Sequence, residues 1–310
     1  MIINTGCRTD IPAFYSEWFY NRIREGYVMA RSPYRPELVT RWRLDPEVVD
    51  CIVFCTKNPQ PMLERLGELK AFGQLWGVTV TPYGREIEPG VPAKEKVLDS
   101  FRRLSELAGP EAVYWRYDPI FLSEKYSLAF HLDAFERMAG ELAGYTDSCV
   151  ISFIDLYEKT KRNFPAARAV RREERIQIGQ AFAETGAKYG MRIISCCEGT
   201  ELASYGVDVS GCMTQERVER ALGYSLEVPG RASAVREGCG CLLGSDIGVY
   251  NTCGHGCLYC YANASREAVR QNMALHDPSS PLLTGHLLPE DQVRDGTQKS
   301  WFSGQMRLAF

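Results

Sequence analysis

Short apolar segments alternate with amphipathic helical segments through the first two thirds of the chain, and this alternation limits the fold most. Six β-branched or apolar runs predict strands at 1–5, 50–55, 77–81, 112–117, 149–154 and 191–195. The intervening segments 60–73, 93–109 and 129–145 carry apolar residues at helical spacing. Strands that alternate with helices predict β/α units around a parallel sheet. We therefore expect an α/β fold with a (β/α) barrel or partial barrel of six to seven parallel strands.

The regular alternation ends near residue 210. Residues 1–210 are expected to form the β/α barrel units, and residues 211–310 form a cysteine-rich segment followed by a C-terminal tail. A seventh strand is predicted within 242–252, and the chain runs from it directly into a cysteine motif. We expect the second segment to pack as part of the same domain.

Polar side chains follow each of the predicted strands at its C-terminal end, where β/α barrels build their active sites. The resulting candidates are Thr9, Asp10, Lys57, Arg116, Asp118, Asp155 and Glu198. Any one of them can equally be a helix cap or a loop hydrogen bond. Asp10, for example, is well placed to cap a helix that begins at Pro12.

A group of three cysteines occupies a C-x3-C-x2-C frame within eight residues, at Cys253, Cys257 and Cys260. A structural zinc ion takes four protein ligands, so zinc would need a fourth from Cys239, Cys241 or His255. A cubane iron–sulfur cluster held by three cysteines leaves one iron atom open to an outside molecule. The residues alone leave both metals open.

The motif also has an aromatic residue before its last cysteine and the sequence Tyr-Ala-Asn after that cysteine. In these features it resembles the cluster-binding signature of radical S-adenosylmethionine (SAM) enzymes. The resemblance implies a 4Fe-4S cluster on the three cysteines, with SAM chelated at the open iron. It further implies reductive cleavage of SAM to a 5′-deoxyadenosyl radical that acts on an unknown substrate. The electron would come from a reducing donor such as ferredoxin or flavodoxin.

A wider resemblance covers essentially the whole chain. Segments such as RTDIPAFYSEWFYNRIREGY, TKNP, WRYDPI and DIGVYNTCGHGCLYCYAN are similar to an uncharacterised bacterial and archaeal family, the domain of unknown function 1848. The family carries no assigned reaction. Its members have SRRTDIP and WTKNP where this chain has NTGCRTDIP and CTKNP, so Cys7 and Cys55 depart from the pattern. These two cysteines could add thiolate ligands or simply replace bulkier side chains.

The order of the motif along the chain differs from that of radical SAM enzymes, in which the motif normally follows the first barrel strand. Here the motif follows the last predicted strand, so we predict a circularly permuted barrel with that strand beside residues 1–5 in space. By this resemblance, Thr9 and Asp10 are expected to contact the SAM amine, with Lys57 as a further cosubstrate contact. The residues expected to line the substrate cavity are Arg116, Asp118, Asp155 and Glu198.

Four more cysteines are candidates for an auxiliary iron–sulfur cluster, and these are Cys196, Cys212, Cys239 and Cys241. The alternative is that the Cys-x-Cys pair at 239–241 is a loop dithiol or belongs to the motif site. Cys51 and Cys149 lie in apolar runs and are expected to be small core residues.

Charge and composition narrow the range of partners. The net charge is −3 and no basic block stands out, which makes nucleic acid an improbable partner. No segment approaches a membrane span and the N-terminus lacks a secretory leader, so we expect a cytoplasmic protein with reduced cysteines. The alternative to a radical enzyme is a non-catalytic zinc- or iron–sulfur-binding protein whose barrel binds a nucleotide or a partner.

Overall fold

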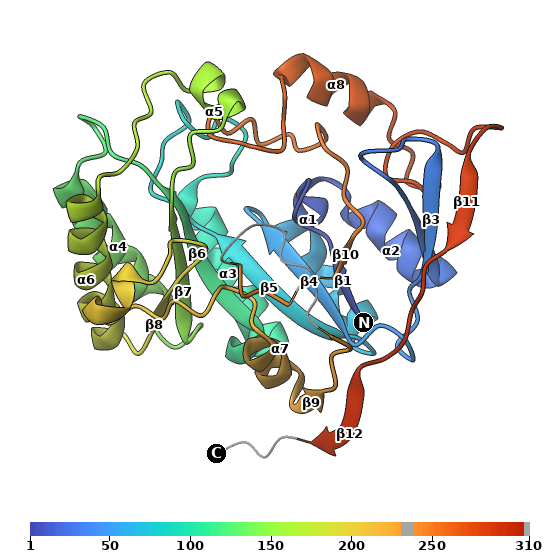
Figure 1. Cartoon of the computed structure of the whole chain (residues 1–310), viewed down its shortest axis with the longest axis horizontal. Coiled ribbons are helices and arrows are strands. Elements are labelled where there is room, and N and C mark those ends of the chain that lie inside the picture. Colours follow the sequence, from blue (N-terminus) through green and yellow to red (C-terminus); the bar gives the residue numbers. More distant parts are fainter. Residues whose placement is uncertain (231–238, 243, 307–310) are drawn as a thin grey trace.

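The computed structural model describes residues 1–230, 239–242 and 244–306. Within these residues, seven parallel strands form one sheet in the order β10-β1-β4-β5-β6-β7-β8 (Figure 1). Their bounds are β1 (Ile2–Asn4), β4 (Cys51–Thr56), β5 (Gly73–Thr79), β6 (Val113–Ile120), β7 (Ser148–Phe153), β8 (Arg192–Ser195) and β10 (Ser245–Asp246). The predicted parallel α/β sheet is thereby confirmed, with β10 and β8 as its two edges.

The strand nearest the cysteine motif in sequence lies beside the N-terminal strand, as predicted. Ile3 pairs with Ser245 and Asn4 pairs with Asp246, both in parallel. The strand is short, because β10 has only two residues within the range 242–252 that was predicted to contain it. The Asp246 side chain accepts a hydrogen bond from the Gly248 N–H at 2.8 Å, and this turn bends the chain out of the sheet.

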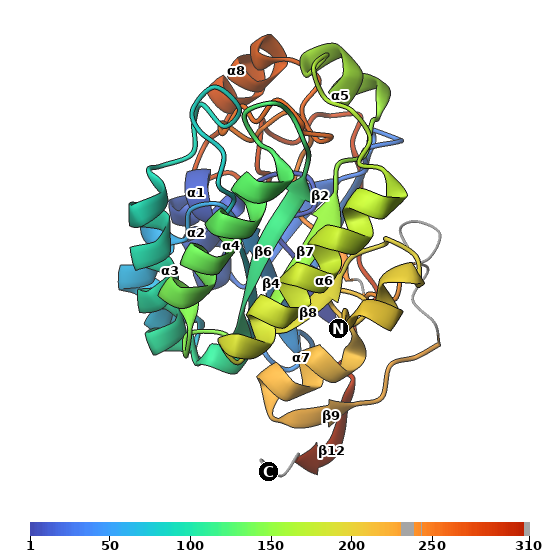
Figure 2. The ribbon, with the colours of Figure 1, turned by 90° about the vertical axis from the view of Figure 1, so that its left-hand side faces the viewer.

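Helices cover one face of the sheet, where α3, α4 and α6 lie side by side in Figure 2. The bounds of the helices on this face are α1 (Ile11–Phe14), α2 (Ser16–Glu25), α3 (Lys94–Ala108), α4 (Leu128–Leu142), α6 (Arg172–Lys188) and the 3-10 helix η1 (Gln60–Leu69). The remaining helices are α5 (Glu158–Asn163), α7 (Gln215–Leu222), α8 (Arg266–Ala274) and the short 3-10 turns η2 (Pro110–Ala112) and η3 (Glu201–Tyr205). None of the helices in the described ranges has the length and apolarity that crossing a membrane requires.

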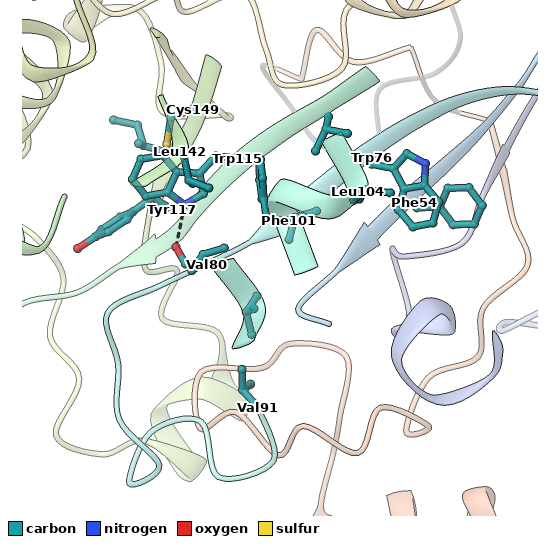
Figure 3. Packing of buried hydrophobic residues seen from close by; sticks show 14 of the residues in the cluster. Phe54, Trp76, Val80, Val91, Phe101, Leu104, Trp115, Tyr117, Leu142 and Cys149 are labelled. Atoms are coloured by element: carbon teal, nitrogen blue, oxygen red, sulfur yellow. Dashed lines mark hydrogen bonds between the residues drawn. The ribbon is translucent and has the colours of Figure 1, made fainter. Parts of the chain in front are cut away.

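Both faces of the sheet are buried over most of their area, as parallel sheets require. Against the helices, Phe54 stacks on Trp76 with ring centroids 3.8 Å apart, and Trp115 donates to the Val80 carbonyl at 2.9 Å (Figure 3). Cys149 is fully buried in this layer, and Cys51 is fully buried on the opposite face, so the prediction that both are core residues is confirmed. The opposite face packs against α7 and neighbouring segments.

Two small sheets lie outside the main sheet and were not predicted from the sequence. The strands β2 (Tyr27–Arg31), β3 (Leu38–Arg43) and β11 (Gln292–Asp295) form one, and β9 (Tyr224–Leu226) pairs with β12 (Phe302–Met306) in the other. The hairpin of β2 and β3 begins directly after Gly26, which ends α2 with a left-handed φ of 75°. The C-terminal segment therefore contributes a strand to each small sheet.

A buried histidine gives the fold a predictable dependence on pH. The Tyr117 hydroxyl donates to His131 Nδ1 at 2.7 Å, and His131 Nε2 donates to the Phe121 carbonyl at 2.9 Å. Burial lowers the pKa of His131 to about 4 from the usual 6.5. The unfolded chain therefore takes up this proton at a higher pH than the native state does. The free energy of unfolding therefore keeps its full value above pH 6.5. It decreases by about 3 kcal/mol in all as the pH falls towards 4.

The variant His131→Gln should accordingly lose less stability than the wild type between pH 7.5 and pH 4.5, measured by urea unfolding at each pH. The exposed His286 supplies the control, since His286→Gln should follow the wild-type profile. Equal pH profiles for His131→Gln and the wild type would show that His131 does not carry this dependence.

Candidate functional site

The cysteine motif lies on the loop between β10 and α8, at the C-terminal edge of the parallel sheet (Figure 1). Asparagines close the base of this loop. Asn251 has a left-handed φ of 58°, and the Asn263 amide donates to the Cys253 carbonyl at 2.8 Å. Ser265 caps α8 by accepting from the Ala268 N–H at 3.1 Å. The motif therefore has a fixed backbone.

The three motif thiols are partly buried and lie close enough to influence each other's charge. Burial raises the pKa of Cys253 well above its usual value, and it raises the pKa of Cys257 to about 12. The Lys57 ammonium opposes the shift at Cys257, and the His255 backbone N–H donates to Cys253. A cysteine binds a metal as its thiolate. The positive charge of a bound metal would therefore have to offset the cost of burying the thiolate charge here.

His255, which lies between the first two cysteines, fastens the motif to two other loops. Its Nε2 lies 2.8 Å from Asp10 Oδ2, and its Nδ1 lies 3.3 Å from the Gly90 carbonyl. The Gly90 N–H donates to the His255 carbonyl at 2.8 Å, and the Leu258 N–H donates to the Ile87 carbonyl at 3.0 Å. Both ring nitrogens thus have protein partners, so His255 is poorly placed to serve as a fourth zinc ligand.

Asp10 and Thr9, the predicted cosubstrate contacts, both lie against the motif loop. Asp10 caps α1 through the Ala13 N–H at 3.0 Å, and its other oxygen accepts from the Lys57 N–H at 2.8 Å and faces His255. The Thr9 hydroxyl lies 2.7 Å from that of Thr252. Asp10 is therefore a helix cap and also a brace for the motif.

A buried carboxylate, which the sequence did not single out, supports the motif from the loop after β5. Glu88 is 1% exposed and forms ion pairs with Lys57, at 2.9 Å, and with Lys94. The Thr81 hydroxyl donates to it at 2.6 Å. The hydroxyl of Tyr259, a residue of the motif, also donates to it. Burial opposes the charge of Glu88, yet the two lysines hold its pKa down at about 2. Lys94 is close to Glu88 in the chain, but Lys57 and Tyr259 are distant. Nothing local therefore marks Glu88 as a support for the motif.

Arg116 and Asp118, predicted to line a substrate cavity, form an ion pair on the sheet face opposite the helices. Asp118 also accepts a hydrogen bond from Ser152 of the neighbouring strand. Burial opposes the charge of Arg116, but Cys55 and Asp118 beside it raise its pKa well above the usual value. Cys55, one of the two departures from the family pattern, therefore shares this face with the ion pair.

Glu198 and Asp155 lie beyond the C-terminal ends of β8 and β7. Glu198 accepts from the Phe153 N–H at 2.8 Å and lies 3.6 Å from the Arg175 guanidinium. Burial raises the pKa of Glu198 to about 7, although the Phe153 N–H opposes the shift. Asp155 is exposed and accepts from the Tyr157 hydroxyl at 3.2 Å. Of the two, Glu198 is the better candidate for proton exchange near neutral pH.

The cysteines predicted for an auxiliary cluster also meet. Cys212 Sγ lies 3.4 Å from Cys196 Sγ and 3.2 Å from Cys241 Sγ. Hydrogen bonds from these two thiols, aided by Arg116, lower the pKa of Cys212 well below its usual value. Cys239 lies close enough to influence the charge of Cys241.

In the part of the chain that the structure describes, no three His, Cys, Asp or Glu side chains are placed to hold one metal ion. A surface hollow of about 320 Å³ lies away from all the candidate residues, and its lining is Tyr27, Arg41, Arg43, Asp295, Gly296 and Gln298.

The contact between Gly90 and the motif gives a testable consequence. A Cβ at Gly90 would lie 2.6 Å from the Gly254 carbonyl oxygen and 2.9 Å from His255 Cα. The variant Gly90→Ala should therefore displace the motif loop and lower any metal bound there by about tenfold, the scale of a lost supporting contact. Metal analysis of the purified variant checks this. Gly67, whose Cβ would meet nothing within 4 Å, supplies the control Gly67→Ala. Full metal content in Gly90→Ala would contradict the anchoring role.

Comparison with known families gives one match. A family model described as "Domain of unknown function (DUF1848)" matches residues 2–262. The matched range begins at β1 and includes all three motif cysteines together with the loops that hold them. No curated protein matches the chain.

Proposed function

The chain belongs to the DUF1848 family, whose description assigns no reaction, and from its motif loop we propose that it is a radical SAM enzyme. Cys253, Cys257 and Cys260 would hold a 4Fe-4S cluster on a permuted partial barrel. When bound, the cluster supplies the electron that cleaves SAM reductively to a 5′-deoxyadenosyl radical, which acts on an unknown substrate. The electron donor would be a protein such as ferredoxin or flavodoxin, and the enzyme would be cytoplasmic.

The observation that carries the proposal is the position of the motif in the sheet. β10 is late in sequence yet pairs with β1, and the loop that leaves it lies at the C-terminal edge of the sheet. The loops after β1 and β5 brace it through Asp10 and Gly90. A permuted radical SAM barrel would place its motif in this way.

The residues around the motif fit a three-cysteine cluster better than a four-ligand zinc site. Both His255 nitrogens face protein acceptors, and Cys241 lies in contact with Cys212 in the other thiol group. Three thiolates for which the described residues offer no clear fourth ligand suit an iron–sulfur cluster with one open iron. The Lys57 ammonium, which influences the charge of Cys257, would offset part of the negative charge.

The polar residues at the same edge supply candidate partners for the small molecules. Thr9 and Lys57 would contact the amino-acid part of SAM. Asp10 would contact the SAM amine and would also hold His255 in place. The side chains that would face the substrate are Arg116, Asp118, Asp155 and Glu198. Of these, the Arg116–Asp118 pair is fixed by Ser152, so it would give the substrate site a rigid polar wall.

The test is electron paramagnetic resonance of anaerobically reconstituted, dithionite-reduced protein, with and without SAM. A cubane signal that changes on adding SAM is expected, because SAM would bind the open iron directly. A cubane signal that ignores SAM would favour the alternative of a non-catalytic iron–sulfur protein. Zinc in place of iron would favour a zinc-binding protein whose barrel binds a nucleotide or partner.

A further inference from the structure

A second group of thiols forms where three distant segments meet. Cys196 follows β8, Cys212 precedes α7 and Cys241 precedes β10. The Cys212 sulfur contacts the other two at 3.4 and 3.2 Å, and all three thiols are free. None of these contacts involves a motif cysteine, although Cys241 is close to Cys253 in the chain.

The two loops that carry Cys212 and Cys241 are fitted closely to each other by glycine. A Cβ at Gly240 would lie 2.3 Å from the Ser210 carbonyl oxygen, and Gly211 has a φ of 115° that other residues rarely adopt. The Leu242 N–H donates to the Met213 carbonyl at 2.6 Å. The backbone therefore holds the thiols together independently of any contact between the sulfur atoms.

The charge around this thiol group suits an anionic ligand set. Cys212 is 7% exposed, and the positive charge of Arg116 helps to lower its pKa. A guanidinium beside several thiols would compensate part of the charge that they carry as thiolates. Cys239 precedes Cys241 by two residues and influences its charge, which makes Cys239 a candidate for a fourth sulfur ligand.

We propose that Cys196, Cys212, Cys239 and Cys241 form a second metal centre whose ligands are all thiolates, separate from the motif. Thiolates select soft ions, so the occupant is a zinc ion or an iron–sulfur cluster. A tetrahedral zinc site with Zn–S bonds of about 2.3 Å places its sulfurs about 3.8 Å apart. The sulfurs here would move apart by about half an ångström for zinc, and further for a cluster whose irons each bind one cysteine.

The experiment removes the motif first, so that the second centre is measured by itself. The variant with Cys253, Cys257 and Cys260 all changed to serine is produced with iron and zinc in the medium and purified anaerobically. Zinc, iron and acid-labile sulfide are then measured per chain. One zinc is expected if the occupant is a single ion, and four iron with four sulfide if it is a cubane. Adding Cys212→Ser should lower the metal content at least about tenfold.

Controls separate loss of the centre from loss of the fold. Cys149→Ala in the same background removes a core cysteine outside the thiol group and should keep the metal. Cys241→Ser, on a partly exposed loop, repeats the test if Cys212→Ser does not fold by circular dichroism. A folded motif-free variant without metal, or one whose metal survives both Cys212→Ser and Cys241→Ser, would overturn the proposal. Neither result depends on whether the motif binds SAM.

Discussion

Replacing Cys257 with alanine is expected to remove the iron held at the motif and to lower SAM cleavage by more than about 100-fold. The change deletes one of three ligands, and even outer contacts of a metal site are worth about 10- to 100-fold. The remaining cysteines, Cys253 and Cys260, would leave two irons of a cubane without a protein ligand. Iron and sulfide content, together with release of 5′-deoxyadenosine under dithionite, measure the effect.

The control is Cys149→Ala, which removes a fully buried thiol from the helix-covered face of the sheet. This variant should keep the wild-type iron content and the wild-type rate of SAM cleavage. Any metal at the second thiol group should also survive Cys257→Ala, so the total would fall without reaching zero. Unchanged iron and unchanged cleavage in Cys257→Ala would show that Cys257 is not a ligand.

Replacing Glu88 with glutamine is expected to destabilise the protein by about 3 kcal/mol. The amide keeps the shape of the carboxylate but removes its charge, which leaves the ammonium groups of Lys57 and Lys94 without their buried partner. Breaking a buried ion pair from one side costs about 3–5 kcal/mol, and the lower end applies because the Lys94 side chain is 21% exposed. Urea unfolding of the metal-free protein at pH 7 measures this.

A double variant tests whether the cost comes from unpaired charge. Glu88→Gln combined with Lys94→Met removes one of the two unpaired cations. The double variant should therefore lose less stability than the two single variants lose together. A matched surface control is Glu158→Gln, whose ion pair with Lys161 is exposed to solvent, so its loss should leave the stability close to that of the wild type. Strict additivity of Glu88→Gln and Lys94→Met would contradict the coupling.

The Glu88 cluster shows what the sequence could not supply. The motif and its tyrosine were visible in the sequence, but the carboxylate that Tyr259 contacts is far away in the chain. Local spacing carries no information about this pairing, because the loop after β5 reaches the motif only in the folded chain, at the carboxyl edge of the sheet. The same holds for the contacts of Cys212 with Cys196 and Cys241.

Other features followed from local physical chemistry. The alternating apolar runs gave the six main strands, since a strand buried on both faces needs apolar side chains on both sides. Ser265 caps α8 through its own hydroxyl, a contact with a residue only three positions away in the chain. The β2–β3 hairpin was missed, although Gly26 ends the helix before it, because its strands are stabilised by each other and by β11.

Sequence alone determined the strands of the main sheet, the main helices, the buried core cysteines and the spacing of the motif, because each depends on residues close together in the chain. The hypothesis of a circular permutation placed the strand before the motif beside β1, and the parallel pairing of β10 with β1 confirms that position. Only the tertiary structure decided what surrounds the motif. Asp10 and Gly90 contact the His255 ring, and Glu88 forms ion pairs with two lysines. Such contacts join loops that are neighbours at one edge of the sheet, and strand order, not sequence distance, sets which loops those are.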